Sequence, residues 1–516
     1  MQELSGLDAT FLYLETPNIP MHVGGVSVIE GSLDFDTFRD LIKTRIHLSR
    51  SFTQRLVQTP IGLDRPYWID DPNFNLDYHL HHTALPDPGD WRQLRRLASR
   101  IFSQPLDRSR PLWEFVFVEG LNSIPQVPSG SAALISKVHH AAIDGVSGSN
   151  IMSMIFDITP KGRDLPPPKK YKPEKVPGNL KLFMRSVQNL ATRPLKLPEL
   201  LFETAKSTVK AGYLTRVQGL QAPTLPFNAP RTRLNTKVSP NRIWNASLLD
   251  FKRVQALRRA IPGSTVNDVI LTICAGALRR YLVAKNDLPD EPLVAMVPVS
   301  IRTKKQKNTM GNQVSAMFIQ LATDVEDHIE RLQKICENTK TGKTYHEALD
   351  AKSLTSYAEF IPFALGGLAA RVYSRADISK RHKPFFNVVI TNVPGPQIPL
   401  YMAGHRLLTH MAMAPIFDGM GLILTIFSYN GMISISPTSA QNIMPDIDKL
   451  ALFLREVANE MEADVFAKLN NQNIIPLNRP EPDTTTLCKA ITKSGKQCLN
   501  QSLKDSQFCR VHSPQE

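Results

Sequence analysis

Two blocks of alternating strand-like and helix-like segments set the fold of this chain. Residues 1–160 contain runs rich in β-branched and aromatic residues, such as HVGGVSVIEG and LWEFVFVEG, which alternate with segments of helical periodicity such as FDTFRDLIKTRI. Residues 240–466 repeat the arrangement, with the helix NDVILTICAGALRRYLVAK and the strands LVAMVPVSI and FNVVITNV. Because strands that alternate with helices bury a sheet against those helices, we expect an α/β protein with two lobes of similar size.

A basic, proline-containing segment, residues 161–239, separates the two blocks. Between Lys161 and Val217 it holds thirteen Lys and Arg against four Asp and Glu, and so carries nine of the chain's 14 net positive charges. It opens with the linker-like LPPPKKYKPEKVPG, because proline interrupts helix and sheet alike, and amphipathic helices are expected after it. Two roles stay open: helices that cross over a lobe with solvated charges, or a surface that lies on anionic lipid with its apolar face down.

Neither a secretory signal nor a membrane-spanning helix is expected. The start, MQELSGLDATF, lacks the basic and apolar regions of a signal peptide, so we expect a cytoplasmic protein. The longest uncharged run, Gly419 to Gln441, contains Asn430-Gly431 between two β-branched segments. Asn-Gly favours the type I′ turn of a hairpin, so this run is predicted to be a buried β-hairpin. The composition, 42% hydrophobic and 21% charged, is that of a globular protein and excludes a wholly disordered chain.

The sequence HHAAIDG, residues 139–145, follows a predicted strand and carries the strongest chemical signal. Neighbouring strand residues point to opposite faces, so at most one of His139 and His140 is expected to project into a given cavity. A neutral imidazole suits the removal of a proton near neutral pH, and Asp144 is placed to orient the ring or its loop, while Gly145 permits a turn. No serine or cysteine stands in a nucleophile-elbow pattern, which favours direct attack by a substrate hydroxyl over a covalent acyl-enzyme.

Together with other stretches, this motif resembles a known enzyme family. The stretches are LSGLDATFLYLETPNIPMHVGG at the start, Pro111 to Glu114, HHAAIDG, Asn267-Asp268, VPVSIR ending at Arg302, GNQVSAM and ITNVPGP. In this order they resemble the bacterial wax ester synthase/diacylglycerol acyltransferase family, within the HHxxxDG superfamily of coenzyme A-dependent acyltransferases. The resemblance implies two chloramphenicol-acetyltransferase-like lobes with an active-site channel between them.

The resemblance also implies roles for the motif residues. His140 is expected to be the general base that takes the hydroxyl proton of diacylglycerol or a long-chain alcohol, while the oxygen attacks the thioester of acyl-CoA. Triacylglycerol or a wax ester and free coenzyme A would result. Asp144 is expected to be structural, with Arg302 as its partner, and His139 and Gly145 complete the motif.

Three further residues are candidates for substrate binding, oxyanion stabilisation or structural support. Asn267, followed by Asp268, is expected either to stabilise the oxyanion or position the acceptor, or to cap the helix that follows. Trp113 is expected at the lobe junction, and a plain core position is the alternative.

The C-terminal segment predicts a metal site. Residues 467–486 are polar and proline-rich, as in a flexible linker, and residues 487–513 contain Cys488, Cys498, Cys509 and His512. Three thiolates and an imidazole satisfy tetrahedral zinc, and so short a segment has too little core to fold otherwise. We expect a structural zinc module; a tail with free thiols is the alternative, and no redox cofactor is expected.

Two rival functions stay open. One is a condensation-type acyltransferase that uses carrier-protein thioesters. The other is a non-catalytic lipid- or nucleic-acid-binding protein that uses the basic linker and the zinc tail. The expected partners of the leading hypothesis are acyl-CoA, diacylglycerol or a long-chain alcohol, and the surface of a membrane or lipid inclusion; nucleic acid is not expected.

Overall fold

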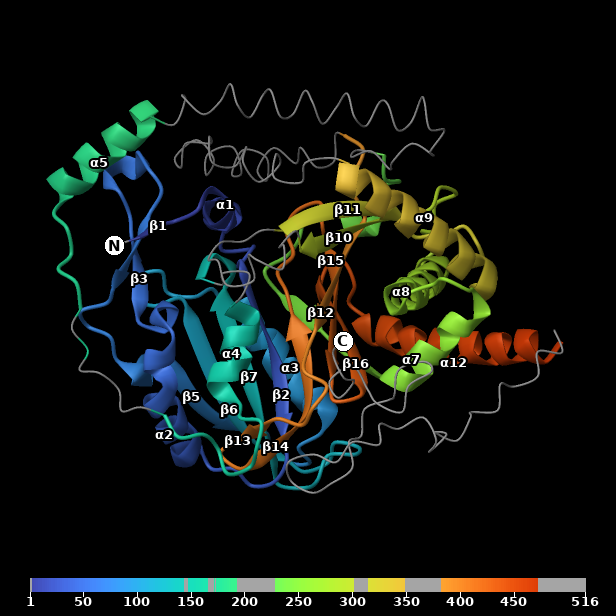
Figure 1. The fold of residues 1–516 in the computed structure, drawn as a ribbon, viewed down its shortest axis with the longest axis horizontal. Coiled ribbons are helices and arrows are strands. Elements are labelled where there is room, and N and C mark those ends of the chain that lie inside the picture. Colours follow the sequence, from blue (N-terminus) through green and yellow to red (C-terminus); the bar gives the residue numbers. More distant parts are fainter. Residues whose placement is uncertain are drawn as a thin grey trace, which may run out of the picture. The chain divides into compact units, whose positions relative to one another are not determined.

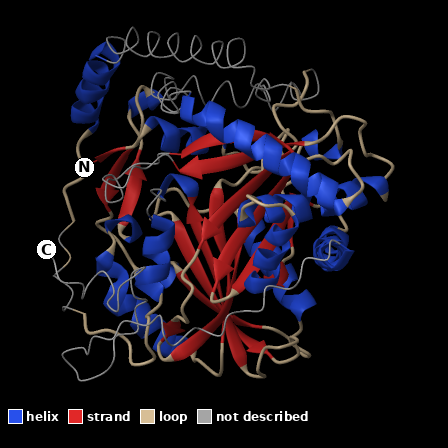
Figure 2. Ribbon diagram, turned by 45° about the vertical axis from the view of Figure 1, so that its right-hand side comes forward, coloured by secondary structure: helices blue, strands red, loops and turns tan. Residues whose placement is uncertain are grey.

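A computed structural model describes residues 2–142, 147–165, 171, 173–192, 228–300, 314–348 and 382–471 (Figure 1). The chain divides into two compact units, residues 1–462 and 463–516. The sheets described here all lie in the first unit, and Figure 2 shows helices on either side of their strands.

The first large sheet has six strands and positions the HHAAIDG motif. Its order is β13 (Tyr401–Met402), β14 (His405–Met413), β2 (His22–Ile29), β7 (Ser131–His139), β6 (Trp113–Leu121) and β5 (Leu80–Ala84). The strand that leads into the motif, β7, is central and pairs antiparallel with both β2 and β6.

Helices cover both faces of this sheet because successive side chains of its strands alternate between two cores. Phe115 and Phe117 point to the face covered by α2 (Phe35–Arg45) and α4 (Ser147–Ile155), whereas Val116 and Val118 point to the face covered by α3 (Trp91–Ser103). The expected α/β architecture of the first block is confirmed in these elements.

A hairpin from late in the sequence completes the first sheet. Strand β14 pairs antiparallel with β2, so that Met411 lies opposite Val26. A Cβ atom on Gly25 would lie 2.7 Å from the Met411 carbonyl oxygen, and the glycine therefore permits this close pairing. The first lobe thus includes strands that lie outside residues 1–160.

The second large sheet has seven strands. Its order is β11 (Val314–Gln320), β10 (Val294–Ser300), β12 (Val388–Pro394), β15 (Leu422–Tyr429), β16 (Met432–Ala440) and β8 (Arg242–Trp244), with β9 (Ser247–Asp250) also paired to β16. Its helices are α7 (Phe251–Leu257), α8 (Val266–Val283), α9 (His328–Ala348) and α12 (Ile447–Asn471).

The predicted buried hairpin is confirmed. Strands β15 and β16 pair antiparallel, and Asn430 and Gly431 between them have φ angles of 44° and 81°, as a type I′ turn requires. Within the described residues, no helix has both the length and the apolar character needed to cross a membrane.

The remaining elements surround the N-terminus. A three-stranded sheet consists of β1 (Gln2–Glu3), β4 (Tyr67–Asp70) and β3 (Gln54–Val57), and the nearby helices are α1 (Gly6–Leu14) and α5 (Asn179–Thr192). Helix α1 begins at its N-cap Ser5, whose hydroxyl accepts the Asp8 amide. Short 3₁₀ helices lie at Ile46–Leu48, Arg50–Phe52, Pro60–Gly62, Leu76–Tyr78, His140–Ala142 (η5), Arg233–Asn235 and Arg258–Ala260.

Candidate active site

The two histidines of the motif lie where β7 ends and η5 begins. The His139 amide donates to the Leu112 carbonyl (2.9 Å), and the His140 amide donates to the Met21 carbonyl (2.8 Å). These bonds fix the backbone of both residues on neighbouring segments, and the chain then leaves the sheet. Helix α1 packs against η5.

His139 is buried, and its side chain hydrogen-bonds within its own loop. Its Nδ1 accepts the Ala141 amide at 3.0 Å, so the ring hydrogen of this tautomer lies on Nε2, which is 3.4 Å from Glu15 Oε1. Glu15 also accepts the Met21 amide (3.2 Å) and binds Arg108, whose Nε lies 2.6 Å from Oε2. The imidazole of His139 therefore ties the turn at His140 to a buried carboxylate.

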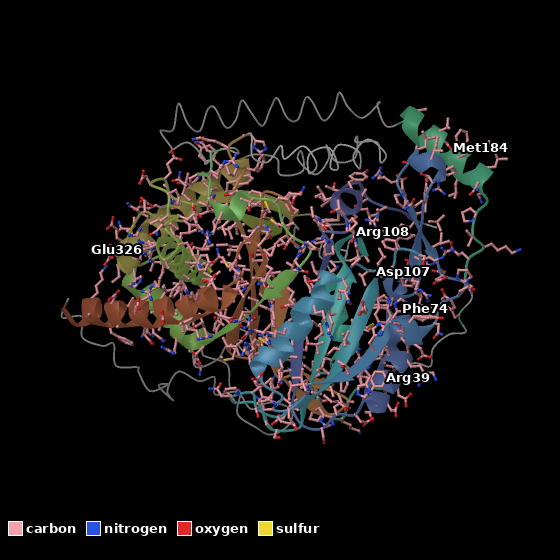
Figure 3. The ribbon with its side chains drawn as sticks, turned by 180° about the vertical axis from the view of Figure 1, so that it is seen from behind. Arg39, Phe74, Asp107, Arg108, Met184 and Glu326 are labelled. Atoms are coloured by element: carbon pink, nitrogen blue, oxygen red, sulfur yellow. The ribbon has the colours of Figure 1, made fainter. Side chains whose placement is uncertain are left out.

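Glu15 is strongly acidic in this setting. Burial raises its pKa, but the contact with His139, and then the hydrogen bond and charge of Arg108, outweigh burial and bring the pKa from 4.5 to about 2. The carboxylate therefore stays ionised, and Arg108 is held further by the Leu12 carbonyl (3.2 Å). Figure 3 labels Arg108 on the side of the molecule seen from behind.

His140 faces away from this network. Its ring stacks on Phe11 of α1, with centroids 3.7 Å apart and planes inclined by 14°. Its Nδ1 is buried and has no hydrogen-bond partner in the described part of the chain, although the residue as a whole is partly exposed. Burial first, and the neighbouring His139 second, lower the pKa of His140 from 6.5 to about 4. The imidazole is consequently neutral near pH 7, as a proton acceptor must be.

A buried lysine anchors α3 to the same strand. The Lys137 ammonium donates to the carbonyls of Ile101 and Gln104 (both 3.2 Å) at the end of α3 and lies 2.8 Å from Glu114. Beside it, His22 Nε2 donates to the Phe102 carbonyl at 2.7 Å. The C-terminal end of α3 is thus fixed against β2 and β7.

The Asn-Asp motif begins α8 in the second lobe. Thr265 is the N-cap of this helix, and Asp268 completes a capping box by accepting the Thr265 amide (2.7 Å). The other oxygen of Asp268 accepts the Thr339 hydroxyl of α9 at 2.7 Å. Asp268 is therefore in a structural position, and the capping role considered for Asn267 belongs to Thr265.

Asn267 lies next to the TNVPGP segment. Its Oδ1 accepts the Asn392 side-chain amide at 3.3 Å, and within the described residues its own Nδ2 makes no recorded hydrogen bond. A half-buried amide donor is thus available at the start of α8.

Trp113 lies in the core of the first lobe. Its Nε1 donates to the Phe52 carbonyl (2.9 Å), and its ring stacks on His79 at 4.5 Å between centroids. This is the core position considered as the alternative in the sequence. Several other candidates lie outside the described residues: Asp144, Gly145, Arg302, Cys488, Cys498, Cys509 and His512.

Comparisons with known proteins give the family. A model of the wax ester synthase/diacylglycerol acyltransferase catalytic domain matches residues 4–270, and a model of the WS/DGAT C-terminal domain matches residues 310–462. A putative diacylglycerol O-acyltransferase of Mycobacterium tuberculosis is 32% identical over 466 residues, 89% of this chain and 90% of that protein. The chain belongs to the wax ester synthase/diacylglycerol acyltransferase family. The resemblance stated from the sequence is confirmed, and the protein is an acyltransferase.

Solved structures agree with this family and its fold. The wax ester synthase/diacylglycerol acyltransferase from Marinobacter aquaeolei VT8 has a TM-score of 0.64 and 28% identity, over 90% of this chain and 100% of that chain. The first condensation domain of the CDA synthetase has a TM-score of 0.51 and 16% identity, over 90% of this chain and 96% of that chain, and shares the fold. The two-lobed α/β architecture expected for the family is confirmed.

For this member of the wax ester synthase/diacylglycerol acyltransferase family, the motif alone did not reveal that Glu15, Arg108, Phe11 and Lys137 lie around the candidate site. Glu15 stands in an otherwise largely apolar stretch, and Lys137 stands in a segment whose apolar residues predict a buried strand. A charged residue in such a context must find a partner, which is the signal that sequence reasoning offers. Which residue is the partner in each case could be seen only in the folded structure.

Proposed function

We propose that this chain transfers a long-chain acyl group from acyl-CoA to the hydroxyl of diacylglycerol or a long-chain alcohol, with His140 as the general base. The observation that carries the proposal is the His140 imidazole itself: it is neutral, it stacks on Phe11, it is separate from the His139–Glu15 contact, and it belongs to a residue that is partly exposed.

The proposed reaction needs one proton acceptor and no covalent acyl-enzyme. His140 Nε2 takes the hydroxyl proton while the substrate oxygen bonds to the thioester carbonyl carbon. The tetrahedral oxyanion then collapses, the carbon–sulfur bond breaks, and the leaving thiolate takes the proton from the imidazolium. The ester and free coenzyme A leave, and His140 is neutral again. Because buried Nδ1 faces the protein, Nε2 is the nitrogen we assign to this proton.

Asn267 is the residue we assign to the oxyanion or the acceptor. Its Oδ1 is held by Asn392, which leaves its Nδ2 to donate. Loss of one preorganised oxyanion donor typically lowers kcat by about 100-fold to 1,000-fold, so Asn267→Ala should fall in that range. A change of less than about threefold would remove Asn267 from the chemistry.

The base assignment is tested with purified full-length protein. Palmitoyl-CoA with hexadecanol or diolein should yield free coenzyme A and ester, and His140→Ala should lower kcat about 100-fold or more. His81→Ala removes a half-exposed histidine of β5 as a matched control and should leave the rate unchanged. Unchanged turnover in His140→Ala would refute the assignment. Labelled acyl-CoA offered to both acceptors at once reports whether triacylglycerol or wax ester predominates.

We also propose that the protein is cytoplasmic and binds the surface of a membrane or lipid inclusion through α5, which lies in the linker, residues 161–239. Four apolar side chains at helical spacing are exposed on one face: Leu180 (73%), Phe183 (42%), Met184 (65%) and Val187 (46%). Figure 3 shows Met184 directed away from the ribbon.

The opposite face of α5 is fixed to the protein. Leu182 and Ser186 are buried, and the Asn189 amide donates to Asp64 (2.8 Å) and to the Tyr67 hydroxyl (3.1 Å). A helix anchored on one side, with an apolar stripe on the other and basic residues beside it, fits an interfacial lipid contact.

Vesicle sedimentation tests this contact. Leu180→Ser with Met184→Ser should reduce binding to vesicles of phosphatidylcholine and phosphatidylglycerol at least fivefold. Leu452→Ser removes another exposed leucine, on α12 (42%), and should not change binding. Equal binding of the double variant and the unchanged protein would refute the role of α5.

For the C-terminal segment, we propose one structural zinc ion held by Cys488, Cys498, Cys509 and His512, after the expected linker at 467–486, whose first five residues belong to α12. The support is the spacing in the sequence, because three thiolates and one imidazole match a closed tetrahedral site. Metal analysis of purified protein should give about one zinc per chain, and Cys488→Ala with Cys498→Ala should abolish it. Equal zinc in both would refute the site.

A further inference from the structure

A strongly basic groove lies between α3, β8 and the start of α12. Its volume is about 750 Å³, within the range of small-molecule sites. Figure 3 views this side, with α3 (light blue) in front of the strands and α12 (orange-red) beside it. Five arginines and one acid stand in its lining: Arg92, Arg95, Arg96, Arg100, Arg242 and Asp448.

Three of these arginines form an exposed row on α3. Arg92, Arg96 and Arg100 are spaced by four residues, so they lie on one helix face and span about 12 Å at 1.5 Å per residue. Within the described residues, none of the three has a recorded ion pair or hydrogen bond. Like charges four residues apart destabilise a helix by about 0.2–0.5 kcal/mol per pair, so this row does not serve the stability of α3.

The other charged groups that line the groove bind one another or neighbouring polar groups of the protein. Arg95 pairs with Asp448 at 2.5 Å, and Asp448 also accepts the Asn245 side-chain amide at 2.8 Å. Arg242 is buried and donates to the carbonyls of Ser239 (2.6 Å) and Asn18 (2.8 Å). The acid in the lining is thus already neutralised, and the exposed row of three remains without a counter-charge there.

One wall of the groove, the end of α3, contacts the sheet whose strand β7 leads into the candidate base. Ser103, which lines the groove, accepts the Arg242 amide at 2.8 Å. The preceding residue, Phe102, receives the His22 hydrogen bond, and His22 lies directly opposite His139 in the sheet. Contacts through Phe102 and His22 thus connect the wall of the groove to the HHAAIDG motif.

We propose that this groove binds the phosphate groups of a nucleotide ligand, and that in the acyl-transfer reaction it holds the diphosphate and 3′-phosphate of coenzyme A. The second part rests on the proposed function. A row of three cations over about 12 Å matches a small molecule with separated phosphate groups. A single lipid headgroup supplies one phosphate, and a concave polar groove does not suit the plane of a bilayer.

Direct binding tests the proposal without any acyl transfer. Adenosine 3′,5′-bisphosphate is titrated into the full-length protein by calorimetry, and R92Q/R96Q/R100Q should weaken its binding at least tenfold. A control with three other exposed cations neutralised, K43Q/K252Q/R259Q, should stay within twofold. The triple arginine variant should unfold at the same or a higher temperature, because its change removes like-charge neighbours.

Two results would overturn the proposal. One is equal binding of the bisphosphate by the unchanged protein and the triple arginine variant. The other is no binding of the bisphosphate, together with vesicle binding to phosphatidylglycerol that the triple variant loses, which would assign the groove to lipid. H140A should still bind the bisphosphate, so a failure of the base assignment is distinguishable from a failure of the groove.

Discussion

Replacing Glu15 by glutamine removes one negative charge and keeps the shape of the side chain. In the folded protein the pKa of Glu15 falls from its ordinary 4.5 to about 2, because His139 and Arg108 outweigh the effect of burial. Since a tenfold change in acid dissociation is about 1.4 kcal/mol, the ionised carboxylate contributes about 3 kcal/mol at pH 7. The side chain is only 6% exposed, so solvent screens little of this. We expect Glu15→Gln to lower the free energy of unfolding by about 2–3 kcal/mol.

The stabilisation by Glu15 should depend on pH in a definite direction. A depressed pKa contributes stability that is fully present above 4.5 and is lost as the pH falls toward 2. The difference between the two proteins in urea unfolding should therefore be largest at pH 7 and should fall to about half at pH 3. Glu330→Gln, at an exposed ion pair with Lys334, is the control and should change stability by less than about 0.5 kcal/mol.

The transferase activity should also depend on the contact between Glu15 and His139. Without the carboxylate, the His139 ring loses its fixed orientation beside the Ala141 amide, and the turn that places His140 loosens. Because small displacements of catalytic groups are costly, kcat should fall about tenfold or more while KM changes little. A stability difference that is the same at pH 7 and pH 3, or a kcat equal to that of the unchanged protein, would refute this reasoning.

Three other outcomes are expected. The kcat of the transferase should be level from pH 8 to about pH 5 and fall near pH 4, because His140, the proposed general base, accepts a proton only when it is neutral and its pKa is about 4; a pH–rate profile that turns near 6.5 would contradict this. Lys137→Ala should destabilise by about 3–5 kcal/mol in urea, since it leaves the Glu114 carboxylate and two carbonyls without their donor, and a loss below about 1 kcal/mol would disprove that account. Thr265→Ala should cost about 1 kcal/mol in thermal unfolding by removing the cap of α8, whereas Thr265→Ser should restore it.

Features set by neighbouring residues were predictable from the sequence. The Asn430-Gly431 turn followed from the backbone angles that these two residues tolerate, and the strand that ends at His139 followed from its run of β-branched and apolar residues. The motif likewise indicated that the two histidines have different roles, and the structure places them in different surroundings.

Features set by residues far apart were not predictable. Glu15 and Arg108 are 93 positions apart, and only the packing of α1 on η5 brings the carboxylate to His139. The apolar pattern of β14 fits either sheet, so the sequence does not say that it pairs with β2. Trp113 was also ambiguous, because a tryptophan on a strand suits both a core and a cavity wall.

The pairing of β14 with β2 has a consequence for synthesis. Until residues 405–413 have left the ribosome, the nascent first sheet exposes the unpaired edge of β2, including Gly24 and Gly25. Such an edge is open to any passing strand. An N-terminal fragment that lacks β14 should therefore aggregate when it is expressed alone, and this enzyme gains a complete first lobe only after residues 405–413 have been translated.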